Sequence, residues 1–522
     1  MRAFTFSGIV HRPQRHLPIL LIMGVAVALR LLYITAPLLD AHRWRQVDTA
    51  SIARTFYEER FNPFKPEVNW GGAHGAVESE FPLLPALAAL LYTVFGPDEV
   101  WGRLVVVVFS LGSVWLTYVL GRQLLDHAGG LAAATLVAVS PAAVFYGRAF
   151  MPDSLMVCFS LAALVGFVQH ARTGAPLPLI AGSCALGLTV LVKLPGILVL
   201  APVAAALWHV RGWQAVRDWR LWLAVAVPVA VATAWYWHAY QIYLDTGLTF
   251  GVIGTTKTYP AFVATSQWTT AFSKWSSVEL LTSTPLYDLM LSRLYFLHLT
   301  PPGFALALVG LLLWRAQAWR TVVDSWLAAM VAFILVAGAG HMGHDYYQLP
   351  LVPIFALYFA AAARPLFDAD WIAATVGPGL APRVGVALVV WAVAAMSFWY
   401  SGVIARHFRP AAQDVRILKA GEAIQRGLGE PGLIVVVDDY GVNSPMLLYF
   451  AHAKGWSFDA DTVTAPVVRT LEAQGARYFA STRWSQLRRK QPDLVAYLQT
   501  RHAPVLVDAP ADTVLFDLRL PR

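Results

Sequence analysis

The sequence predicts an α-helical polytopic membrane protein with a small C-terminal soluble α/β domain. Of the 522 residues, 57% are hydrophobic and only 13% are charged, whereas soluble domains average roughly 45–50% and 25%. The apolar residues fall in blocks of about 20, the length of helix that crosses a hydrocarbon core. A wholly soluble protein is excluded, because too few polar side chains are present to cover a globule of this size.

The length criterion gives about eleven spans, and up to about 13 when ambiguous blocks are counted. The predicted spans are Leu17–Leu39, Trp101–Leu124, Leu131–Tyr146, Leu155–Gln169, Leu177–Val192, Leu194–Trp208, Leu221–Tyr243, Leu294–Trp314, Trp326–Gly340, Tyr347–Ala363 and Val384–Ile404. A further block, Pro82–Phe95, is short for a span. If it does not cross, the short loops rich in arginine all face the cytoplasm, as the positive-inside rule requires.

If Pro82–Phe95 does cross and Leu177–Trp208 forms two spans, the later basic loops move outside. Merging that pair returns them to the cytoplasm but leaves Arg122 and Arg172 outside. We therefore predict the arrangement in which Pro82–Phe95 does not cross and the N-terminus is cytoplasmic.

The basic residues do not form a run that would indicate nucleic-acid binding. The net charge is +8, but the lysines and arginines are dispersed among short loops, a pattern typical of topology signals and of contact with membrane lipids. The two cysteines, Cys158 and Cys184, lie inside apolar blocks, so no disulfide framework is expected.

The predicted topology gathers the longer polar segments on one face of the membrane. They are residues 40–80, 146–153, the break at Lys193, residues 245–293, residues 341–348 and everything after Arg406. We therefore divide the chain into a transmembrane catalytic domain, 1–404, whose external loop is 40–80, and an external α/β domain, 405–522.

The α/β domain is predicted from alternating strand and helix patterns after Ser401. Leu433–Val437, Arg477–Ala480 and Val505–Val507 are expected strands, and Ala465–Gln474 and Asp493–Thr500 are expected helices. Two acid-x-acid strings, Asp368-Ala-Asp370 and Asp459-Ala-Asp461, are too short to indicate a metal site. Asp438 and Asp439 are interpreted as turn residues, with sugar binding as the second interpretation.

Polar side chains crowd the start of the external loop. In a helix, Arg45, Asp48 and Thr49 share one face, and His42 lies beside Arg45 and Gln46. Together with Asp40 these side chains could bind an anion or a sugar. The alternative is a solvated loop with a local Arg45–Asp48 ion pair.

Glu78 and Glu80 stand directly before the apolar block that opens with Pro82. Acids at this position commonly cap a helix. A carboxylate can also act as a general base that takes a proton from a hydroxyl or an amine, and two acidic clusters bracket this one loop.

Three charged residues lie at the junctions between later predicted spans. Arg148 and Asp153 lie in the short turn 146–153, where pairing with each other to end the helices is the alternative to binding substrate. Lys193 interrupts an apolar run, where a cation needs a partner or water, and it is a candidate ligand for a lipid phosphate.

The string His344-Asp345-Tyr346-Tyr347 lies at a span boundary. His341, His344 and one acid are too few ligands for a zinc site, and tyrosines are common at membrane interfaces. Binding of a phosphate or a sugar by His344 and Tyr347 is the functional interpretation.

The chain resembles the GT-C type glycosyltransferases, in particular the protein O-mannosyltransferases and the aminoarabinose or galacturonic acid transferases that act on lipid A. Residues 50–54 look like the Ala-Glu-Ile-Ser-Arg stretch of those families, Glu80-Phe-Pro82-Leu is similar to their Glu-x-Pro-Pro-Leu string, and Tyr347-Gln-Leu-Pro350 with Pro353 is similar to their Tyr-x-Leu-Pro span. Val192-Lys193-Leu194 resembles a Thr-Lys-Gly segment.

The chain departs from the family pattern at two positions. Relatives have Asp-Glu where this chain has Arg45-Gln46, so the resemblance assigns the catalytic acid to Asp40 or Asp48. Relatives also have a basic residue where Phe81 stands, which leaves phosphate binding to Lys193, Arg148 or the string 344–347.

The resemblance implies a GT-C-like fold and an inverting transfer of one sugar from a polyprenyl-phosphate donor. Asp40 would be the base, Asp48 or Glu80 would orient the acceptor or a divalent cation such as Mg²⁺ or Mn²⁺, and cations would stabilise the leaving phosphate. The acceptor would be lipid A, another glycan or lipid, or a protein, and the site would face the periplasm from the bacterial inner membrane.

A transporter or flippase of a lipid-linked or sugar substrate is the main alternative. Transporters commonly show internal repeats and midplane sites, whereas here no repeat is visible and the polar residues gather at one face. A scaffold whose external domain binds a polymer is a second alternative, disfavoured by the clustered acids.

Overall fold

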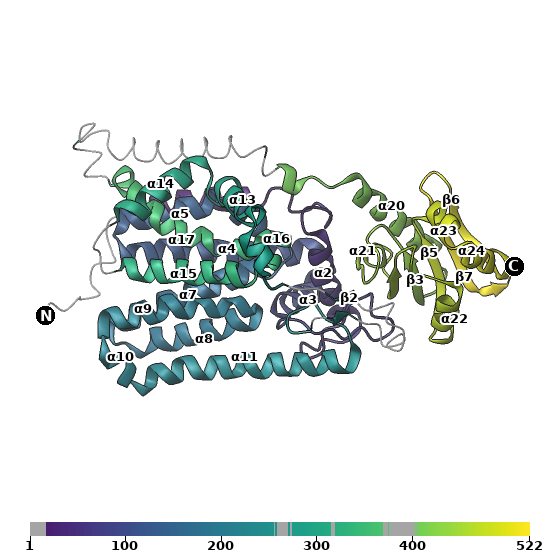
Figure 1. The fold of residues 1–522 in the computed structure, drawn as a ribbon, viewed down its shortest axis with the longest axis horizontal. Helices are drawn as coiled ribbons and strands as arrows, with labels where there is room; N and C mark the ends of the chain where they lie inside the picture. Colours follow the sequence, from purple (N-terminus) through teal and green to yellow (C-terminus); the bar gives the residue numbers. More distant parts are fainter. Residues whose placement is uncertain are drawn as a thin grey trace.

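A computed structural model shows a helical bundle joined to a small α/β domain (Figure 1). It describes residues 17–254, 274–314, 319–368 and 405–521, with isolated positions between them. The predicted span Val384–Ile404 and Asp370 lie outside the described residues. The predicted combination of a helical membrane-type fold and a small C-terminal domain is confirmed.

The long bundle helices lie roughly side by side along the length of the molecule (Figure 1). Their bounds are α1 Leu17–Arg30, α4 Glu99–Leu124, α5 His127–Val139, α6 Pro141–Tyr146, α7 Asp153–Thr173, α8 Pro176–Val192, η2 Leu194–Val199, α9 Leu200–Arg211, α10 Trp213–Arg217, α11 Trp219–Thr246, α14 Pro301–Leu313, α15 Arg320–Val336, α17 Leu351–Ala363 and η7 Arg364–Phe367. The shorter elements α12 Val278–Thr282, α13 Thr284–Arg293, η5 Leu294–Leu299, α16 Gly338–Gly343 and η6 Asp345–Gln348 lie among them.

By length and composition, four helices of the described part could each cross a bilayer: α4, α7, α11 and the continuous pair η2 and α9. A fifth span results if α13 with η5 and α14 are joined, although these bend by 105°. Several shorter apolar helices accompany them. The broken helices explain why fewer elements pass this criterion than the apolar blocks of the sequence predict.

Two predicted spans are interrupted just before a proline, and a third, Trp326–Gly340, breaks at Ala337 between α15 and α16. Leu131–Tyr146 breaks at Ser140, whose hydroxyl caps α6 and donates to the carbonyl of His298. Leu294–Trp314 breaks at Thr300, which has φ 82° and precedes two prolines. Proline lacks an amide proton and clashes with the preceding helical turn, so a continuous helix is disfavoured at both points. The predicted break at Lys193 is confirmed.

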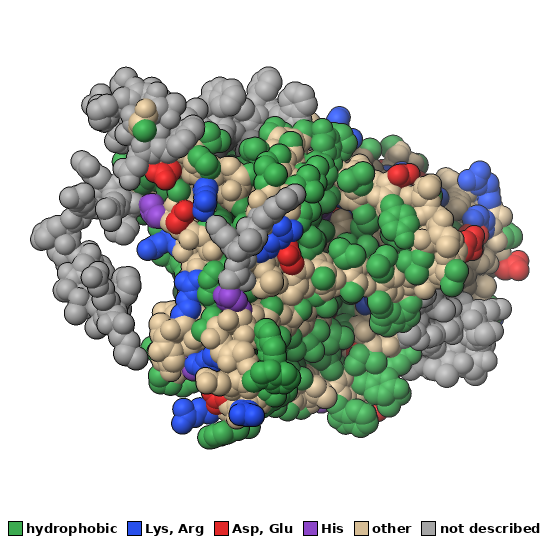
Figure 2. All heavy atoms as spheres, turned by 60° about the vertical axis from the view of Figure 1, so that its left-hand side comes forward, with side chains coloured by type: hydrophobic (Ala, Val, Ile, Leu, Met, Phe, Trp, Pro, Cys, Tyr) green, Lys and Arg blue, Asp and Glu red, His purple; other side chains and the backbone are tan. Residues whose placement is uncertain are grey.

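The short basic connectors meet at one end of the bundle. Arg172 donates to the carbonyl of Gln123 and lies over the Trp319 ring, Arg364 is 3.5 Å from Asp126, and Arg211 donates to the carbonyl of His170. Figure 2 shows broad hydrophobic areas on one face, with basic side chains gathered mainly along one side of it and a few nearer the middle. This pattern fits a bundle whose waist contacts lipid.

Helix α3, Leu83–Phe95, lies beside α2, Arg43–Glu58, at the other end. The Phe81 amide before α3 donates to the carbonyl of Leu191 at the end of α8, and Phe95 at its far end stacks on Trp101 at the start of α4. Both ends of α3 therefore stay near the external loop, which favours the interpretation that Pro82–Phe95 does not cross.

The C-terminal domain is a five-stranded sheet in the order β4-β3-β5-β7-β6. Its elements are α20 Ala412–Gly427, β3 Leu433–Val437, α21 Met446–Phe450, β4 Gly455–Phe458, α22 Ala465–Ala473, β5 Ala476–Ser481, α23 Trp484–Lys490, α24 Pro492–Arg501, β6 His502–Asp508 and β7 Thr513–Pro521. β3 pairs in parallel with β4 and β5, and β7 is antiparallel to both of its neighbours. A separate pair, β1 Thr256–Lys257 and β2 Thr270–Ala271, is antiparallel.

The external loop joins the two domains through backbone hydrogen bonds. The Gly72 amide donates to the carbonyl of Gly455 and the Gly455 amide to that of Asn69, so the loop covers the edge strand β4. Gly72 has φ 79° and lies against the Trp456 ring, where a Cβ would clash. An exposed edge strand invites unwanted pairing, and the loop removes that edge.

Close helix packing in the bundle depends on small residues, as is common in membranes. A Cβ added at Gly310 of α14 would overlap the carbonyl oxygen of Tyr358 in α17, whereas nothing lies within 4 Å of one added at Gly24 of α1. We expect Gly310→Ala to lower the Tm in detergent by several degrees, because overpacking costs roughly 1–3 kcal/mol. Gly24→Ala should leave the Tm unchanged or slightly higher, and equal shifts in the two variants would contradict this packing.

Candidate active site

Polar segments from distant parts of the chain meet where the bundle faces the C-terminal domain. They are helix α2, the residues before α3, the break between α8 and η2, Lys274, and the turn η6 that follows α16 (Figure 1). Asp40, Glu80, Lys193 and Tyr347 all lie at this end. The segments are brought together as the sequence predicted, whereas the chemical role of each residue stays a prediction.

Three cations occupy this region, and each meets an acceptor. Arg45 Nη2 lies 2.7 Å from Glu80 Oε2, and Lys193 Nζ lies 2.7 Å from Asp153 Oδ1. Lys274 donates to the backbone carbonyl of Gly251. Arg45, Lys193 and Lys274, which we call the cation cluster, all act electrostatically on Glu80. Glu80 and Asp153 pair directly with Arg45 and Lys193, whereas the hydrogen-bond partner of Lys274 within the described residues is a backbone carbonyl. Asp48 and Glu78 act on the cluster from farther away.

Aromatic rings pack beside the cation cluster. Lys193 Nζ lies 4.6 Å from the centre of the Tyr346 ring and 5.1 Å from that of Tyr347, and Arg45 lies over the Phe250 ring. His344 packs against both tyrosines. The face of an aromatic ring attracts a cation without neutralising its charge, so Lys193 can still bind an anion.

The electrostatics of the site favour an anionic ligand. Burial raises the pKa of Glu80, but Arg45, Lys193, a backbone hydrogen bond and Lys274 together outweigh burial and lower that pKa to about 2. Burial lowers the pKa of Lys274, partly offset by Glu80. Burial, helped by His42 and the neighbouring cations, lowers the pKa of His344 to about 3, so His344 is neutral near pH 7 and can accept a hydrogen bond.

Asp40 is enclosed rather than open to the site. Its Oδ2 accepts from Arg148 at 2.5 Å and lies 3.6 Å from Arg103, and its Oδ1 accepts from the Gln46 amide at 2.5 Å. Gln46 in turn accepts from the Phe150 amide. Only 3% of the Asp40 side chain is exposed, against 16% of that of Glu80. This buried set fixes the start of α2 to the turn 146–153.

Asp48 and Glu78 are also held by partners. Asp48 Oδ1 accepts from the Trp70 indole at 2.9 Å. Glu78 is fully buried and accepts from the Thr249 hydroxyl and from the Ile253 and Gly254 amides. Burial raises the pKa of Glu78, opposed by these hydrogen bonds. Glu78 thus anchors the segment that carries Phe250 and Gly251 next to the cation cluster.

Asp345 is the centre of a second hydrogen-bond set. Its Oδ1 lies 2.6 Å from His42 Nε2 and accepts from the Tyr146 hydroxyl, and its Oδ2 lies 3.5 Å from His407 Nε2. These interactions keep the pKa of Asp345 far below its usual range despite burial. His42, at the N-cap of α2, has φ 55°, a left-handed conformation that strains a side-chain-bearing residue and is common at functional sites.

Several local expectations are wrong. Arg45 pairs with Glu80 and not with Asp48, because α2 turns Asp48 toward Trp70. Arg148 and Asp153 do not pair with each other, because each meets a residue from a distant segment, Asp40 or Lys193. Neither Glu78 nor Glu80 caps α3, whose N-cap is Pro82 with no side-chain hydrogen bond.

Sequence reasoning missed four contributors: Lys274, Tyr146, Arg103 and His407. Lys274 lay in the external stretch 245–293, where a lone lysine gives no spacing signal. Arg103 near the start of an apolar block was a usable signal, because a cation in such a place needs a partner.

No group of three or more His, Cys, Asp or Glu side chains within the described residues is arranged to hold a metal ion. The Mg²⁺ or Mn²⁺ suggested by the family resemblance therefore stays a prediction.

Comparison with known proteins gives one sequence family and several solved structures similar to this chain. Residues 79–237 match the sequence family described as dolichyl-phosphate-mannose-protein mannosyltransferase. A search of curated proteins gives no match. The matched residues include Glu80, Arg148, Asp153 and Lys193.

The fold is shared with solved structures. ArnT from Cupriavidus metallidurans, solved with undecaprenyl phosphate, is 14% identical, with a TM-score of 0.63 over 96% of this chain and 98% of that one. The oligosaccharyltransferase AglB from Archaeoglobus fulgidus, solved with an inhibitory peptide and a dolichol-phosphate, is 13% identical, with a TM-score of 0.52 over 93% and 72%. The predicted resemblance to GT-C enzymes is confirmed: the fold agrees with these structures, and residues 79–237 match the mannosyltransferase family model.

The Arg45–Glu80 ion pair predicts a measurable pH dependence. The pKa of Glu80 in the folded protein lies below the ordinary 4.5, so its stabilisation is fully present above that value and is lost as the pH falls toward 2. We expect Glu80→Gln to lower the Tm most at neutral pH, with the difference from wild type shrinking from pH 5 to pH 3. The exposed Glu279→Gln is the matched control, and a difference that grows on acidification would refute the pairing.

Proposed function

We propose that this protein is an inverting glycosyltransferase that moves one sugar from a polyprenyl-phosphate donor to an acceptor in the periplasm. The observation that carries the proposal is the cation cluster next to an apolar bundle, in which Lys274 donates to a backbone carbonyl and pairs directly with no carboxylate of the described residues. A lipid that bears a phosphate supplies both an anion for these cations and a tail suited to the bundle. The ligands of ArnT and AglB support this donor class.

Arg45, Lys193 and Lys274 would bind the donor phosphate and stabilise it as it leaves. In the transfer, the bond from the sugar anomeric carbon to the phosphate oxygen breaks, and its electron pair stays on the phosphate. The negative charge on that leaving group grows during this step, and fixed cations in a water-poor site stabilise it strongly. Tyr346, Tyr347 and the neutral His344 would orient the sugar by hydrogen bonds.

Glu80 is the best placed of the three candidate acids to act as the base. The acceptor hydroxyl or amine attacks the anomeric carbon from the face opposite the phosphate and gives its proton to the base. Glu80 is the most exposed of the three, and a phosphate that binds Arg45 would compete for its partner. That competition weakens the ion pair, so the proton affinity of Glu80 rises when the donor is bound.

Asp40 and Asp48 are assigned positioning roles under this proposal. Each carboxylate is already occupied, Asp40 by Arg148 and Gln46 and Asp48 by the Trp70 indole. Both hold α2, the helix that carries Arg45. This reverses the order expected from the family resemblance, in which Asp40 is the base.

The proposal is tested by transfer from a panel of radiolabelled undecaprenyl-phosphate sugars to a membrane extract, using purified protein in nanodiscs. We expect Glu80→Gln to lower kcat by about 10²- to 10⁴-fold, the usual contribution of a general base. Its affinity for undecaprenyl phosphate should be unchanged or higher, because Arg45 is released. Glu279→Gln should behave as wild type.

Asp40→Asn and Asp48→Asn complete the experiment. Normal transfer by Glu80→Gln, with transfer abolished in a folded Asp40→Asn or Asp48→Asn variant, would assign the base to that residue instead. No transfer from any donor by the wild-type protein, in an extract that contains its acceptor, would remove the proposed function.

A further inference from the structure

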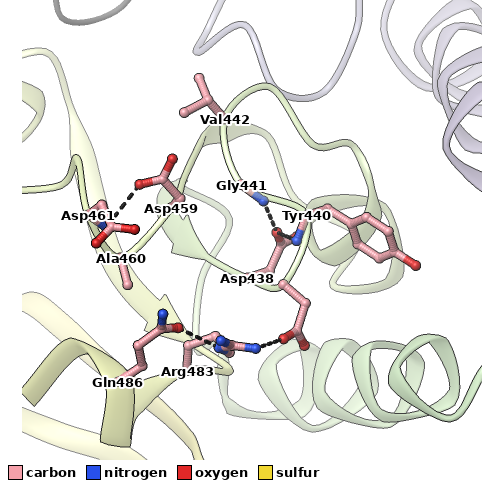
Figure 3. Close-up of a pocket in the computed structure, with 10 residues that line it drawn as sticks. Asp438, Tyr440, Gly441, Val442, Asp459, Ala460, Asp461, Arg483 and Gln486 are labelled. Atoms are coloured by element: carbon pink, nitrogen blue, oxygen red, sulfur yellow. Dashed lines mark hydrogen bonds and ion pairs between the residues drawn. The ribbon is translucent and has the colours of Figure 1, made fainter. Parts of the chain in front are cut away.

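A cleft of about 440 Å³ lies in the C-terminal domain, away from the cation cluster (Figure 3). Its volume is within the range of about 300–1,000 Å³ that is typical of ligand sites. Ten residues line it: Asp438, Asp439, Tyr440, Gly441, Val442, Asp459, Ala460, Asp461, Arg483 and Gln486. Neither the family match, which ends at residue 237, nor the proposed transfer reaction uses any of them.

The cleft stands where the topology of the sheet predicts a ligand. Within the parallel part of the sheet the order is β4-β3-β5, so the chain leaves β3 to one side and returns on the other. The lining residues follow the carboxyl ends of these three strands. In open α/β sheets, ligands bind in the crevice outside the carboxyl ends at such a reversal of strand order.

The walls present polar groups with hydrogen-bonding capacity to spare. Asp459 Oδ1 accepts from the Asp461 and Thr462 amides, while its other oxygen has no partner within the described residues. Gln486 accepts from Arg483 at 2.7 Å, and its amide nitrogen points away from that contact (Figure 3).

The charges of the cleft disfavour an anion. Four carboxylates face one guanidinium in the lining. Asp438 is committed to the Tyr440 and Gly441 amides and to the Ser444 hydroxyl, Asp439 to Arg416 and Arg483, and Asp461 to Lys490. A phosphate or a uronic acid would add negative charge to a cleft that is lined mostly by carboxylates. A neutral or amine-bearing ligand with many hydroxyls matches mixed donors and acceptors.

The cleft is connected directly to the helix that carries Arg45. The Tyr440 hydroxyl accepts from Arg43 Nε at 2.5 Å and donates to Asp414, and Arg43 Nε lies 2.7 Å from Asp414 Oδ1. Trp44 packs edge-on against the Tyr440 ring. Tyr440 therefore belongs at once to the cleft wall and to the contact with α2.

From these features we propose that the cleft binds a saccharide of neutral or amino-sugar type and so holds a glycan acceptor next to α2. The inference rests on the proposed function for its purpose, because a transferase with a separate acceptor subsite can keep a polymeric glycan close between turnovers. Asp459 and Gln486 would contact the ligand directly, accepting from and donating to sugar hydroxyls. Asp438, Asp439 and Arg483 shape the cleft through their internal ion pairs and hydrogen bonds.

The test is saccharide binding to the full-length protein in nanodiscs, which avoids detergents with sugar head groups. Glucosamine tetrasaccharide and maltotetraose are titrated and followed by ligand-observed NMR, with tetragalacturonate as the anionic probe and tetralysine as a peptide probe. We expect saturable binding of at least one of the first two, weakened about tenfold or more by Asp459→Asn combined with Gln486→Ala. The exposed Asp493→Asn, in the same domain but outside the cleft, should bind as wild type does.

The outcomes separate this inference from the proposed function. Binding of undecaprenyl phosphate is measured in the same samples and should be unaffected by the cleft variant, because that ligand belongs to the cation cluster. Absence of saturable binding for both the neutral and the amino saccharide, equal affinity in the cleft variant, or preference for tetragalacturonate or tetralysine would overturn the saccharide proposal. If the wild-type protein does not bind undecaprenyl phosphate, the proposed donor class is wrong.

Discussion

A lysine or arginine that leaves water at the edge of an apolar bundle needs an anion, and this constraint organises the polar end of the molecule. Lys193, in the break between α8 and η2, forms an ion pair with Asp153, and Arg45 on α2 forms one with Glu80. Each pair joins segments that are far apart in the chain. The ion pairs therefore fix where the external loop and the bundle meet. Lys274 lies beside them but donates to a backbone carbonyl instead of to a carboxylate.

The same principle explains why the acids differ in chemical character although they lie in one region. Asp40 is satisfied by arginines and an amide, Glu78 by backbone amides and a hydroxyl, and Asp345 by histidines and a tyrosine. Groups held in this way give rigidity to the site. Glu80 has one ion-pair partner, Arg45, and partial access to water, so a bound ligand can reach it more easily than it can reach Asp40.

Much of the fold could be predicted from the sequence, because span length and strand-helix alternation are local signals. The strand Leu433–Val437 and the break at Lys193 needed only a short window of residues. The partners could not be predicted, because they depend on tertiary contacts: nothing in the sequence links Arg45 to Glu80 rather than to Asp48, or Asp153 to Lys193 rather than to Arg148. Breaks within apolar blocks were also missed, although Ser140-Pro141 and Thr300-Pro301 carry the signal.

The role of the cation cluster is tested directly by measuring its affinity for undecaprenyl phosphate. Native mass spectrometry of the wild type and of Lys274→Gln gives the affinity, with the exposed Lys419→Gln as the matched control. Lys274 is suited to this test because its hydrogen-bond partner within the described residues is the backbone carbonyl of Gly251, so Lys274→Gln takes a direct partner from no carboxylate. We expect the affinity to fall about tenfold or more in Lys274→Gln and to stay unchanged in Lys419→Gln, since a hydrogen bond to a charged group contributes about 1.5–3 kcal/mol. Equal affinity in all three proteins would contradict the proposed phosphate site.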